Sequence, residues 1–285
     1  MSALAAPANI DIRPFASVAD HMQCDALQRR VWGDANTVSP PMSIAIQRHG
    51  GIALGAFERR SGRMIGFVLS FLAPSSLPGA ARGLSQHSHM AAVAPEWQNR
   101  GVGMALKLAQ RHAALAQGIN LITWTYDPLE ARNAMLNIHK LGAICRTYHR
   151  NYYGDMPDTL NAGLATDRFE VEWWLDAGGR SGADQAVSQA PAYTSSLLAE
   201  DKQGVPAVHH IEIDIPLDFQ ALKRTDLNHA RAWRMRTRLQ FEDAFSRGFV
   251  VVDFIRLGPR TFYVLKQQQV ETHHQTTAQL ESADA

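Results

Sequence analysis

The chain has 285 residues, enough for one large domain or two small ones, and an apolar content of 46% can fill a buried core. Its formal net charge is +1, from 28 basic and 27 acidic residues, which excludes a whole-protein attraction to nucleic acid or anionic lipid. No apolar run is long enough to span a membrane, residues 1–10 lack the pattern of a secretion signal, and the two distant cysteines fit a reducing compartment. We therefore expect a cytoplasmic protein.

The first part of the chain predicts a strand, a helix and a hairpin after a flexible tail over residues 1–9. The periodicities place a strand at 10–15, a helix at 17–32, a turn-rich loop at 33–41, and apolar strands at 51–59 and 64–72. The segment Arg60-Ser61-Gly62-Arg63 separates the two apolar strands, and such a short polar segment with glycine is a hairpin signal.

An anion site is predicted where the next strand meets the next helix. A short apolar strand that ends at Pro95 leads into the loop Gln98-Asn99-Arg100-Gly101-Val102-Gly103, from which a helix runs to about Gln117. The first N–H groups of a helix lack intrahelical partners, and the helix dipole adds partial positive charge there. Gly101 and Gly103 have no Cβ, so the backbone can approach a phosphate closely. The structural alternative is an ordinary tight turn.

The rest of the chain predicts further strands and helices, interrupted by a segment rich in Gly, Ala, Ser and Gln at 176–208. The expected elements are strands at 121–126, 144–153, 168–175, 211–215, 249–257 and 261–267, a helix at 131–141, and a long helical pattern that ends near Gly248. No internal repeat is visible in the sequence.

The order of these elements over the first 176 residues resembles the GNAT acyltransferase superfamily, and the loop Gln98 to Gly103 fits its Q/R-x-x-G-x-G/A pyrophosphate signature. The wider chain looks like a bacterial group of large predicted GNAT acetyltransferases, with which it shares Thr125-Tyr126-Asp127-Pro128, Asn151-Tyr152-Tyr153-Gly154 and Ala232-Trp233-Arg234. The resemblance implies an α/β fold, with a GNAT-type mixed central sheet flanked by helices. We expect a C-terminal β-α-β-β unit to extend it.

The same resemblance implies acetyl-CoA, or another acyl-CoA, as the co-substrate, without a metal. The loop N–H groups would hold the CoA pyrophosphate, and the fourth strand would pair with the pantetheine arm in a gap beside the fifth strand. The cofactor-binding residues expected on this basis are Met90, Ala91, Val93, Gln98, Asn99, Arg100, Gly101, Val102, Gly103, Asn133 and Asn137.

Direct attack of an amine on a thioester needs a base for the amine proton. His87 and His89 share one strand face, and imidazole has a suitable pKa, although a hydrogen-bonded or exposed structural histidine is the competing interpretation. No third residue at a helpful spacing completes a metal site with them. Asp127, at the end of the fifth strand, is a second candidate base or an ammonium ligand. It can also be only the turn former before Pro128.

The acid for the leaving thiolate is where the sequence departs from the family. When the chain is aligned on Gly142, the usual tyrosine position holds Ile138, which cannot donate a proton. Tyr148 is the substitute we select from a group that also contains His139, Tyr152 and Tyr153. Either the acid has moved or thiolate release needs none. Asn133 and Asn137 are four residues apart and are expected to share one helix face, toward the pantetheine amides.

Two groups of basic residues are interpreted as solvated helix faces. Lys107 and Arg111 lie one turn apart and could also reach a ribose phosphate. Arg231, Arg234 and Arg238 form a stripe at helical spacing and could also bind an anionic ligand or a partner.

We therefore predict transfer of an acetyl or other short acyl group to a primary amine of a small molecule, which could be amino-acid-like. The alternative is a non-catalytic acyl-CoA-binding or regulatory module. Neither nucleic acid nor a membrane is an expected partner, and a homodimer is left open. The predicted organisation is a tail at 1–9, a GNAT domain at 10–176, a linker at 177–207, a C-terminal α/β unit at 208–269 and a tail at 270–285.

Overall fold

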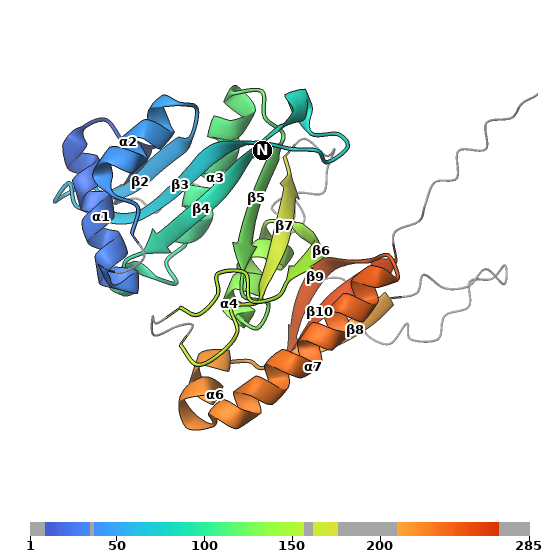
Figure 1. Cartoon of the computed structure of the whole chain (residues 1–285). Coiled ribbons are helices and arrows are strands. Elements are labelled where there is room, and N and C mark those ends of the chain that lie inside the picture. Colours follow the sequence, from blue (N-terminus) through green and yellow to red (C-terminus); the bar gives the residue numbers. More distant parts are fainter. Residues whose placement is uncertain (1–8, 35–36, 157–161, 176–209, 268–285) are drawn as a thin grey trace, which may run out of the picture.

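The computed structural model describes residues 9–34, 37–156, 162–175 and 210–267, so the predicted linker and C-terminal tail lie outside the described residues. Within these ranges ten strands form one sheet in the order β1-β2-β3-β4-β5-β7-β6-β9-β10-β8 (Figure 1). The strands are β1 (Ile10–Pro14), β2 (Ile52–Glu58), β3 (Met64–Pro74), β4 (Leu84–Val93), β5 (Leu121–Tyr126), β6 (Ile144–His149), β7 (Arg168–Trp174), β8 (His210–Ile215), β9 (Phe249–Leu257) and β10 (Arg260–Gln267).

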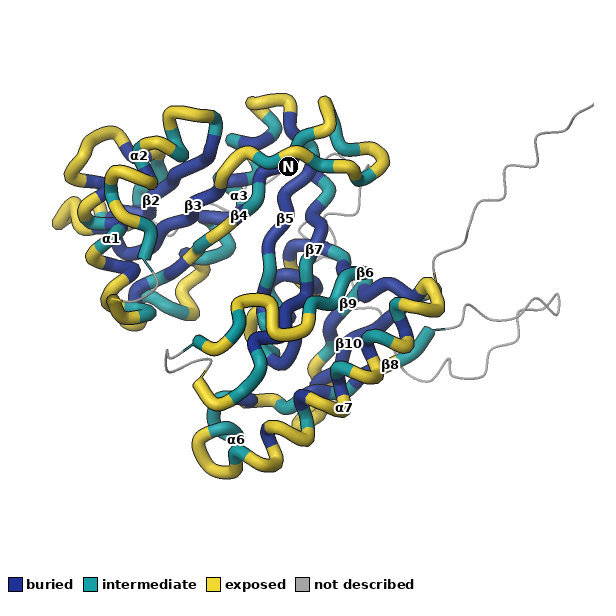
Figure 2. The backbone as a smooth tube through the Cα atoms, in the orientation of Figure 1, coloured by how far each residue is buried: buried dark blue, intermediate teal, exposed yellow. Residues whose placement is uncertain are grey.

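Helices cover both faces of the N-terminal part of this sheet. The helices α1 (Val18–Trp32) and α2 (Pro40–Arg48) pack on one face, here called the first face, and α3 (Val102–Ala116) packs on the opposite, second face. This double cover explains why β2 is apolar and buried at every position from Ile52 to Phe57 instead of alternating with polar residues. Figure 2 shows the resulting band of buried backbone across the sheet, with exposed turns at the outer helices.

Two helical segments differ from the sequence prediction. The loop expected at 33–41 ends in α2, whose first two positions are Pro40 and Pro41. Proline is tolerated there because the first N–H groups of a helix have no partner to lose. The helix expected at 131–141 is split into α4 (Ala131–Ala134) and a π-helical segment, η4 (Met135–Lys140). A π-helical segment is rare, and here it forms a short continuation of α4.

The C-terminal unit continues the sheet. It consists of β8, α6 (Phe219–Thr225), α7 (Leu227–Ser246), β9 and β10, and β9 pairs antiparallel with β6 at Cys145 and Val251. The single helical pattern predicted before Gly248 is interrupted at Asp226, whose carboxylate accepts a hydrogen bond from the N–H of His229 and so starts α7.

The structure contains a topological repeat that the sequence does not reveal. The strands of the segment β5-α4-η4-β6-β7 lie in the order first, third, second, and the strands of β8-α6-α7-β9-β10 lie in the same order. The equivalent strands β6 and β9 meet at the centre. The C-terminal unit therefore extends the sheet, as predicted.

No helix among the described residues combines the length and the apolar composition that crossing a membrane requires.

Candidate acyl-transfer site

An opening between two neighbouring strands defines the site. The strands β4 and β5 run parallel, yet they pair only at Gln86 with Ile122 and at His87 with Thr123, although β4 continues to Val93. Figure 1 shows the two strands diverging below this point. The residues His89 and Ala91 are exposed in what would otherwise be the middle of the sheet. A central strand that loses its neighbour in this way leaves one backbone edge available to another chain-like molecule.

A β-bulge lies at the start of the opening. Opposite β3, Met90 pairs with Leu69 and Ser88 pairs with Ser70, so His89 is the extra residue. A bulge bends the strand and redirects the side chains around it. The residues predicted to bind pantetheine, Met90, Ala91 and Val93, all lie beyond the bulge, on the part of β4 that has no pairing with β5.

The glycine loop lies at the far end of the opening. Gly101 is the N-cap of α3 and has φ = 79°, a left-handed conformation that only glycine adopts without strain. No side chain caps this helix. Among the described residues, the N–H groups of Val102, Gly103 and Met104 make no hydrogen bond to another protein group. The helices α1, α6 and α7 differ, because Ser17, Asp218 and Asp226 cap them with side-chain oxygens.

Space at this loop suits an anion. A Cβ built on Gly101 would meet nothing within 4 Å, and a Cβ on Gly103 would meet only Val93 Cγ2, at 3.9 Å. The loop is held from beneath, since Gln98 Nε2 donates to Val93 O at 3.1 Å and Gln98 Oε1 accepts from Arg132 at 2.9 Å. The exposed Arg100 guanidinium lies over the Trp97 ring. The cradle therefore fits a phosphate, with Asn99 also at positive φ (60°) beside it.

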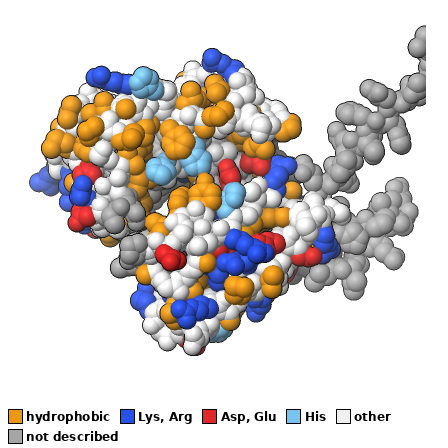
Figure 3. Space-filling view, viewed as in Figure 1, with side chains coloured by type: hydrophobic (Ala, Val, Ile, Leu, Met, Phe, Trp, Pro, Cys, Tyr) orange, Lys and Arg blue, Asp and Glu red, His pale blue; other side chains and the backbone are white. Residues whose placement is uncertain are grey.

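The predicted histidines lie together on the first face at the start of the opening. The ring of Phe71 contacts both, at centroid distances of 5.1 Å from His87 and 5.9 Å from His89. His87 Nδ1 is 3.0 Å from Thr123 Oγ1 on β5. Desolvation lowers the pKa of His87, with a smaller opposing effect from Glu170, so its imidazole is neutral near pH 7. In Figure 3 histidine side chains gather with apolar side chains at the hollow in the middle of the molecule.

Further polar side chains line the first face beyond His87, and the sequence analysis did not bring them together. Tyr153 Oη is 3.0 Å from Thr125 Oγ1, two residues after Thr123. Glu170 lies opposite Thr125 on β7 and pairs with His149 at 2.7 Å. Period-two alternation along β5 and β7 would have placed these residues on one face, but only if the pairing of the two strands had been known.

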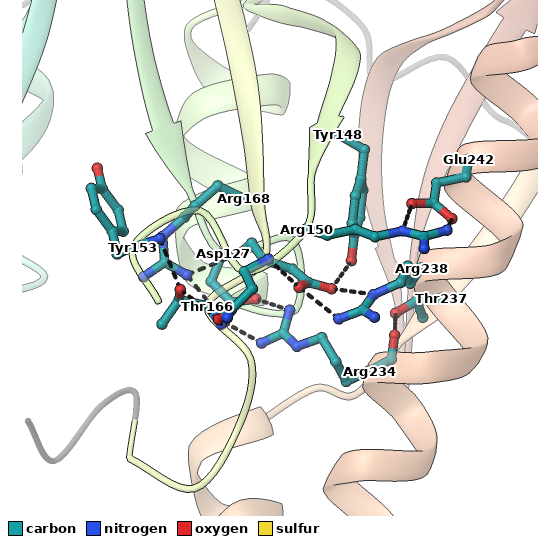
Figure 4. A network of polar contacts seen from close by, with 12 residues as sticks. Asp127, Tyr148, Arg150, Tyr153, Thr166, Arg168, Arg234, Thr237, Arg238 and Glu242 are labelled. Carbon is teal, nitrogen blue, oxygen red and sulfur yellow. Dashed lines mark hydrogen bonds and ion pairs between the residues drawn. The ribbon is translucent and has the colours of Figure 1, made fainter. Parts of the chain in front are cut away.

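Asp127 and Tyr148 lie in a different network, drawn in Figure 4. Asp127 forms a bidentate ion pair with Arg234 of α7, and Arg234 is 3% exposed. Tyr148 donates to Asp167 at 2.6 Å, and Asp167 also pairs with Arg238 at 2.8 Å. This arrangement opposes the predicted proton-transfer roles, because both groups are already bound to partners in contacts that link the end of β5, β6 and the start of β7 to α7. Burial, with the nearby Asp167 charge, raises the pKa of Tyr148 further.

The solvated helix faces predicted for basic residues are wrong at two positions. Arg234 is buried and paired with Asp127, whereas Arg231 of the same stripe is exposed. Lys107 is 5% exposed beneath the sheet on the second face. Helical periodicity identifies a polar helix face, but it does not show whether the neighbouring strands and loops offer buried hydrogen-bond acceptors to that face.

The remaining predicted residues divide between surface and core. Asn133 is exposed in α4 and Asn137 is 6% exposed in η4, so the two amides differ in their access to solvent. Ile138 is 1% exposed and belongs to the main hydrophobic core. Among the described residues, no group of three or more His, Cys, Asp or Glu side chains could hold a metal ion.

The strand order, the opening between β4 and β5 and the glycine loop of α3 are the features that the GNAT resemblance implies. The chain has a GNAT-type fold.

No protein-family model and no curated protein matches the chain. Solved structures with a similar fold include the ribosomal-protein-S18-alanine N-acetyltransferase from Escherichia coli, with 17% identity over 60% of this chain and 97% of that chain and a TM-score of 0.46. A GNAT-family acetyltransferase from Streptococcus pneumoniae has 18% identity over 58% and 99%, with a TM-score of 0.46. The putative acetyltransferase yncA from Salmonella typhimurium, solved with its cofactor acetyl-CoA, has 19% identity over 60% and 97%, with a TM-score of 0.46. Likeness at this level concerns the fold and carries no information about substrates.

Proposed function

We propose that this protein transfers an acyl group, most simply acetyl, from acyl-CoA to a primary amine of a small molecule by direct attack. One observation carries the proposal. The opening between β4 and β5 has a glycine loop with free N–H groups at one end and two histidines at the other. A phosphate-bearing, chain-like co-substrate that lies along β4 would connect these two ends.

The residues around the opening fit acyl-CoA. The N–H groups from Asn99 to Gly103, at the positive end of the α3 dipole, would hold the pyrophosphate. The backbone of β4 at Met90, Ala91 and Val93 would pair with the amides of the pantetheine arm, as an added strand does. When bound, acyl-CoA supplies an activated thioester carbon for the amine.

His87 is the base in this proposal. Its lowered pKa leaves the ring neutral at physiological pH, and its contact with Thr123 occupies only one ring nitrogen. The other nitrogen can therefore take the amine proton. His89 is more exposed and lies beside the same Phe71 ring, where it would bind or orient the amine. The carboxylate of Glu170 would attract an incoming ammonium group to this face.

The net charge of +1 supports a small amine over a polyanion such as nucleic acid. The rival function is a non-catalytic acyl-CoA-binding module. One observation favours that rival, because the position of the usual acid is Ile138, buried in the core.

Binding can be tested by thermal unfolding with and without acetyl-CoA. At 100 times its dissociation constant, acetyl-CoA should stabilise the protein by about 2.7 kcal/mol. The Gly101→Val variant should lose this stabilisation, because a side chain at positive φ distorts the loop. Gly118→Val is the matched control. Gly118 also has positive φ and open space around it, but it lies at the other end of α3, so its variant should keep the effect of acetyl-CoA.

Catalysis can be tested by following thiol release from acetyl-CoA with a panel of primary amines. His87→Ala should lower kcat by about 100-fold or more and remove the low-pH limb of the rate profile, while His89→Ala should mainly change KM. Acetyl-CoA binding without thiol release for any amine would favour the non-catalytic module. No effect of any acyl-CoA on stability would reject both functions.

A further inference from the structure

A buried lysine lies under the opening and has no role in the function proposed above. Lys107 of α3 is 5% exposed, and its Nζ donates to Ser88 Oγ at 2.8 Å and to Gln110 Oε1 at 3.2 Å. The same Nζ lies 4.0 Å from the centre of the Trp124 ring. A buried ammonium group is costly unless it is well solvated by the protein, and this one has neutral acceptors and an aromatic face instead of a carboxylate.

The place of Lys107 is set by the divergence of the strands. The last paired positions of β4 and β5 are His87 and Thr123. The next residue on each strand is Ser88 on β4 and Trp124 on β5, and Nζ of Lys107 contacts both. The ammonium group therefore bridges the two strands at the first position where they no longer pair, on the second face, opposite the histidines.

The distance from the glycine loop to this ammonium group suits the co-substrate. Val93 is beside Gly103, and Ser88 holds Lys107 five residues earlier on β4, about 16 Å along an extended strand. A pantetheine arm has about as many main-chain bonds as four to five extended residues, so its extended length is roughly 15 Å. An arm that starts at the loop and follows β4 would bring its sulfur close to Lys107.

Resting on the proposed function, we infer that Lys107 is the group that stabilises and protonates the leaving thiolate, in place of the tyrosine that Ile138 replaces. In this step the amine nitrogen bonds to the acyl carbon and loses a proton to His87. As the carbon–sulfur bond breaks and its electron pair moves to sulfur, Lys107 gives one of its N–H protons to that sulfur. The products are an amide and a thiol. Neutral Lys107 and protonated His87 return to their starting states by exchanging protons with water.

The energetics of the lysine agree with this role. Burial lowers the pKa of Lys107 to about 7. An ordinary thiol has a pKa of about 8.5, so a proton moves downhill from this ammonium group to a thiolate near neutral pH. In addition, a positive charge next to the sulfur favours the thiolate before the proton moves.

The test combines a spectroscopic titration of bound CoA with kinetics. The ultraviolet absorbance of the thiolate reports the pKa of the CoA thiol in the complex, and the same titration with desulfo-CoA provides the blank. In the wild type the bound thiol should titrate about half a pH unit below its position in Lys107→Met, because Lys107 loses its own proton in the same pH range. Lys140→Met makes the same change on an exposed lysine of η4 and should behave as the wild type.

Kinetic measurements separate the effect of the positive charge of Lys107 from the effect of its proton transfer. Lys107→Met should slow single-turnover acyl transfer by about 100-fold or more, and should remove the fall in rate above pH 7. Lys107→Arg should keep the bound thiol acidic but should still transfer slowly, because a guanidinium does not release its proton near neutral pH. If Met disturbs folding, Ser88→Ala removes one acceptor of the ammonium group only. It should therefore move the falling limb of the rate profile to lower pH and the thiol titration to higher pH.

The outcomes are distinct. An unchanged thiol titration in Lys107→Met, together with normal stabilisation by CoA, overturns this inference and leaves the proposed function intact. A wild type that CoA does not stabilise overturns the proposed function and this inference with it.

Discussion

The sheet has two places where neighbouring strands barely pair. One of them remains open to solvent and the other is covered by helices. At the first, β4 and β5 share two paired positions, and at the second, β6 and β9 share one. Beyond the first pairing, His89 and Ala91 are exposed and the opening remains accessible. At the second, Cys145 and Val251 are both 0% exposed, because η4 and α7 pack over the junction.

The difference shows that poor strand pairing alone does not create a site. A gap in a sheet becomes a binding site only where the neighbouring helices leave it open. Near the first gap α3 begins at Gly101 and places the side chains of Lys107 and Gln110 beneath the strands. Near the second, Phe241 of α7 stacks on Tyr148 and meets Phe169 edge to face. Arginines of α7 pair there with acids of the other unit.

The largest expected effect on stability comes from removing the buried ion pair between Asp127 and Arg234, near the junction of β6 and β9. Arg234→Met leaves the Asp127 carboxylate with only the more distant guanidinium of Arg168, at 3.9 Å. Removing one member of a buried pair typically costs about 3 to 5 kcal/mol. Urea unfolding should show this loss in the free energy of unfolding.

Arg231→Met is the matched control on the same helix, because Arg231 is exposed, and it should change stability by less than about 0.5 kcal/mol. In a double-mutant cycle, Asp127→Asn should lose most of its own cost once Arg234 is Met. Fully additive costs would mean that the pair does not hold α7 in place.

A smaller effect is expected at Asp167, which anchors the connection between β6 and β7. Burial alone would raise the pKa of Asp167, but hydrogen bonds from Arg238, Tyr148 and the Asn151 N–H outweigh it, and the net shift is downward from 3.8. A carboxyl group with a lowered folded-state pKa adds stability above its unfolded-state pKa, and that stability disappears as pH falls through the folded-state value.

Asp167→Asn should therefore cost about 1 to 3 kcal/mol at pH 6, and the difference from the wild type should shrink below about pH 4. Unfolding free energies from pH 6 to pH 2.5 measure it. Asp155→Asn changes an exposed acid of the same connection and should show no such trend. A difference between Asp167→Asn and wild type that is constant with pH would contradict the charge-based explanation.

The smallest effect on stability is expected at the half-exposed pair of His139 and Asp253, which connects η4 to β9. His139 Nδ1 of η4 is 2.9 Å from Asp253 Oδ1 of β9, and this hydrogen bond raises the pKa of His139. A raised pKa adds stability below the unfolded-state value of 6.5, and that stability is lost as pH rises through the folded-state value.

Because water screens this pair, His139→Ala should cost no more than about 1 kcal/mol at pH 5 and almost nothing at pH 9. Thermal unfolding at the two pH values tests the sign. His112→Ala, at an exposed position on α3, is the control. A larger cost at pH 9 than at pH 5 would show that packing, and not charge, accounts for the effect.

Much of the fold could be predicted from the chain, since strand periodicity, the hairpin at Arg60 to Arg63 and the loop at Gln98 to Gly103 are local features. Predictions from local sequence patterns failed where tertiary packing gives a residue a different environment from the one that its spacing suggests. The π-helical segment after Ala134 was not visible in the apolar periodicity, and Asn137 within it is buried whereas Asn133 before it is exposed. Nothing in the spacing of Lys107 indicated a buried position, because its acceptors lie on β4 and within its own helix.

By itself, the sequence determined the glycine loop from which α3 starts. A residue in the left-handed region favours glycine, so the turn at Gly101 and the helix after it could be predicted without the fold. The tertiary structure alone decided which charges are buried and which strands separate. Lys107 contacts the ring of Trp124 on a different element. Asp127 pairs with Arg234, which is 107 residues further along the chain. The energy of a buried charge depends on partners that only folding brings within hydrogen-bonding distance.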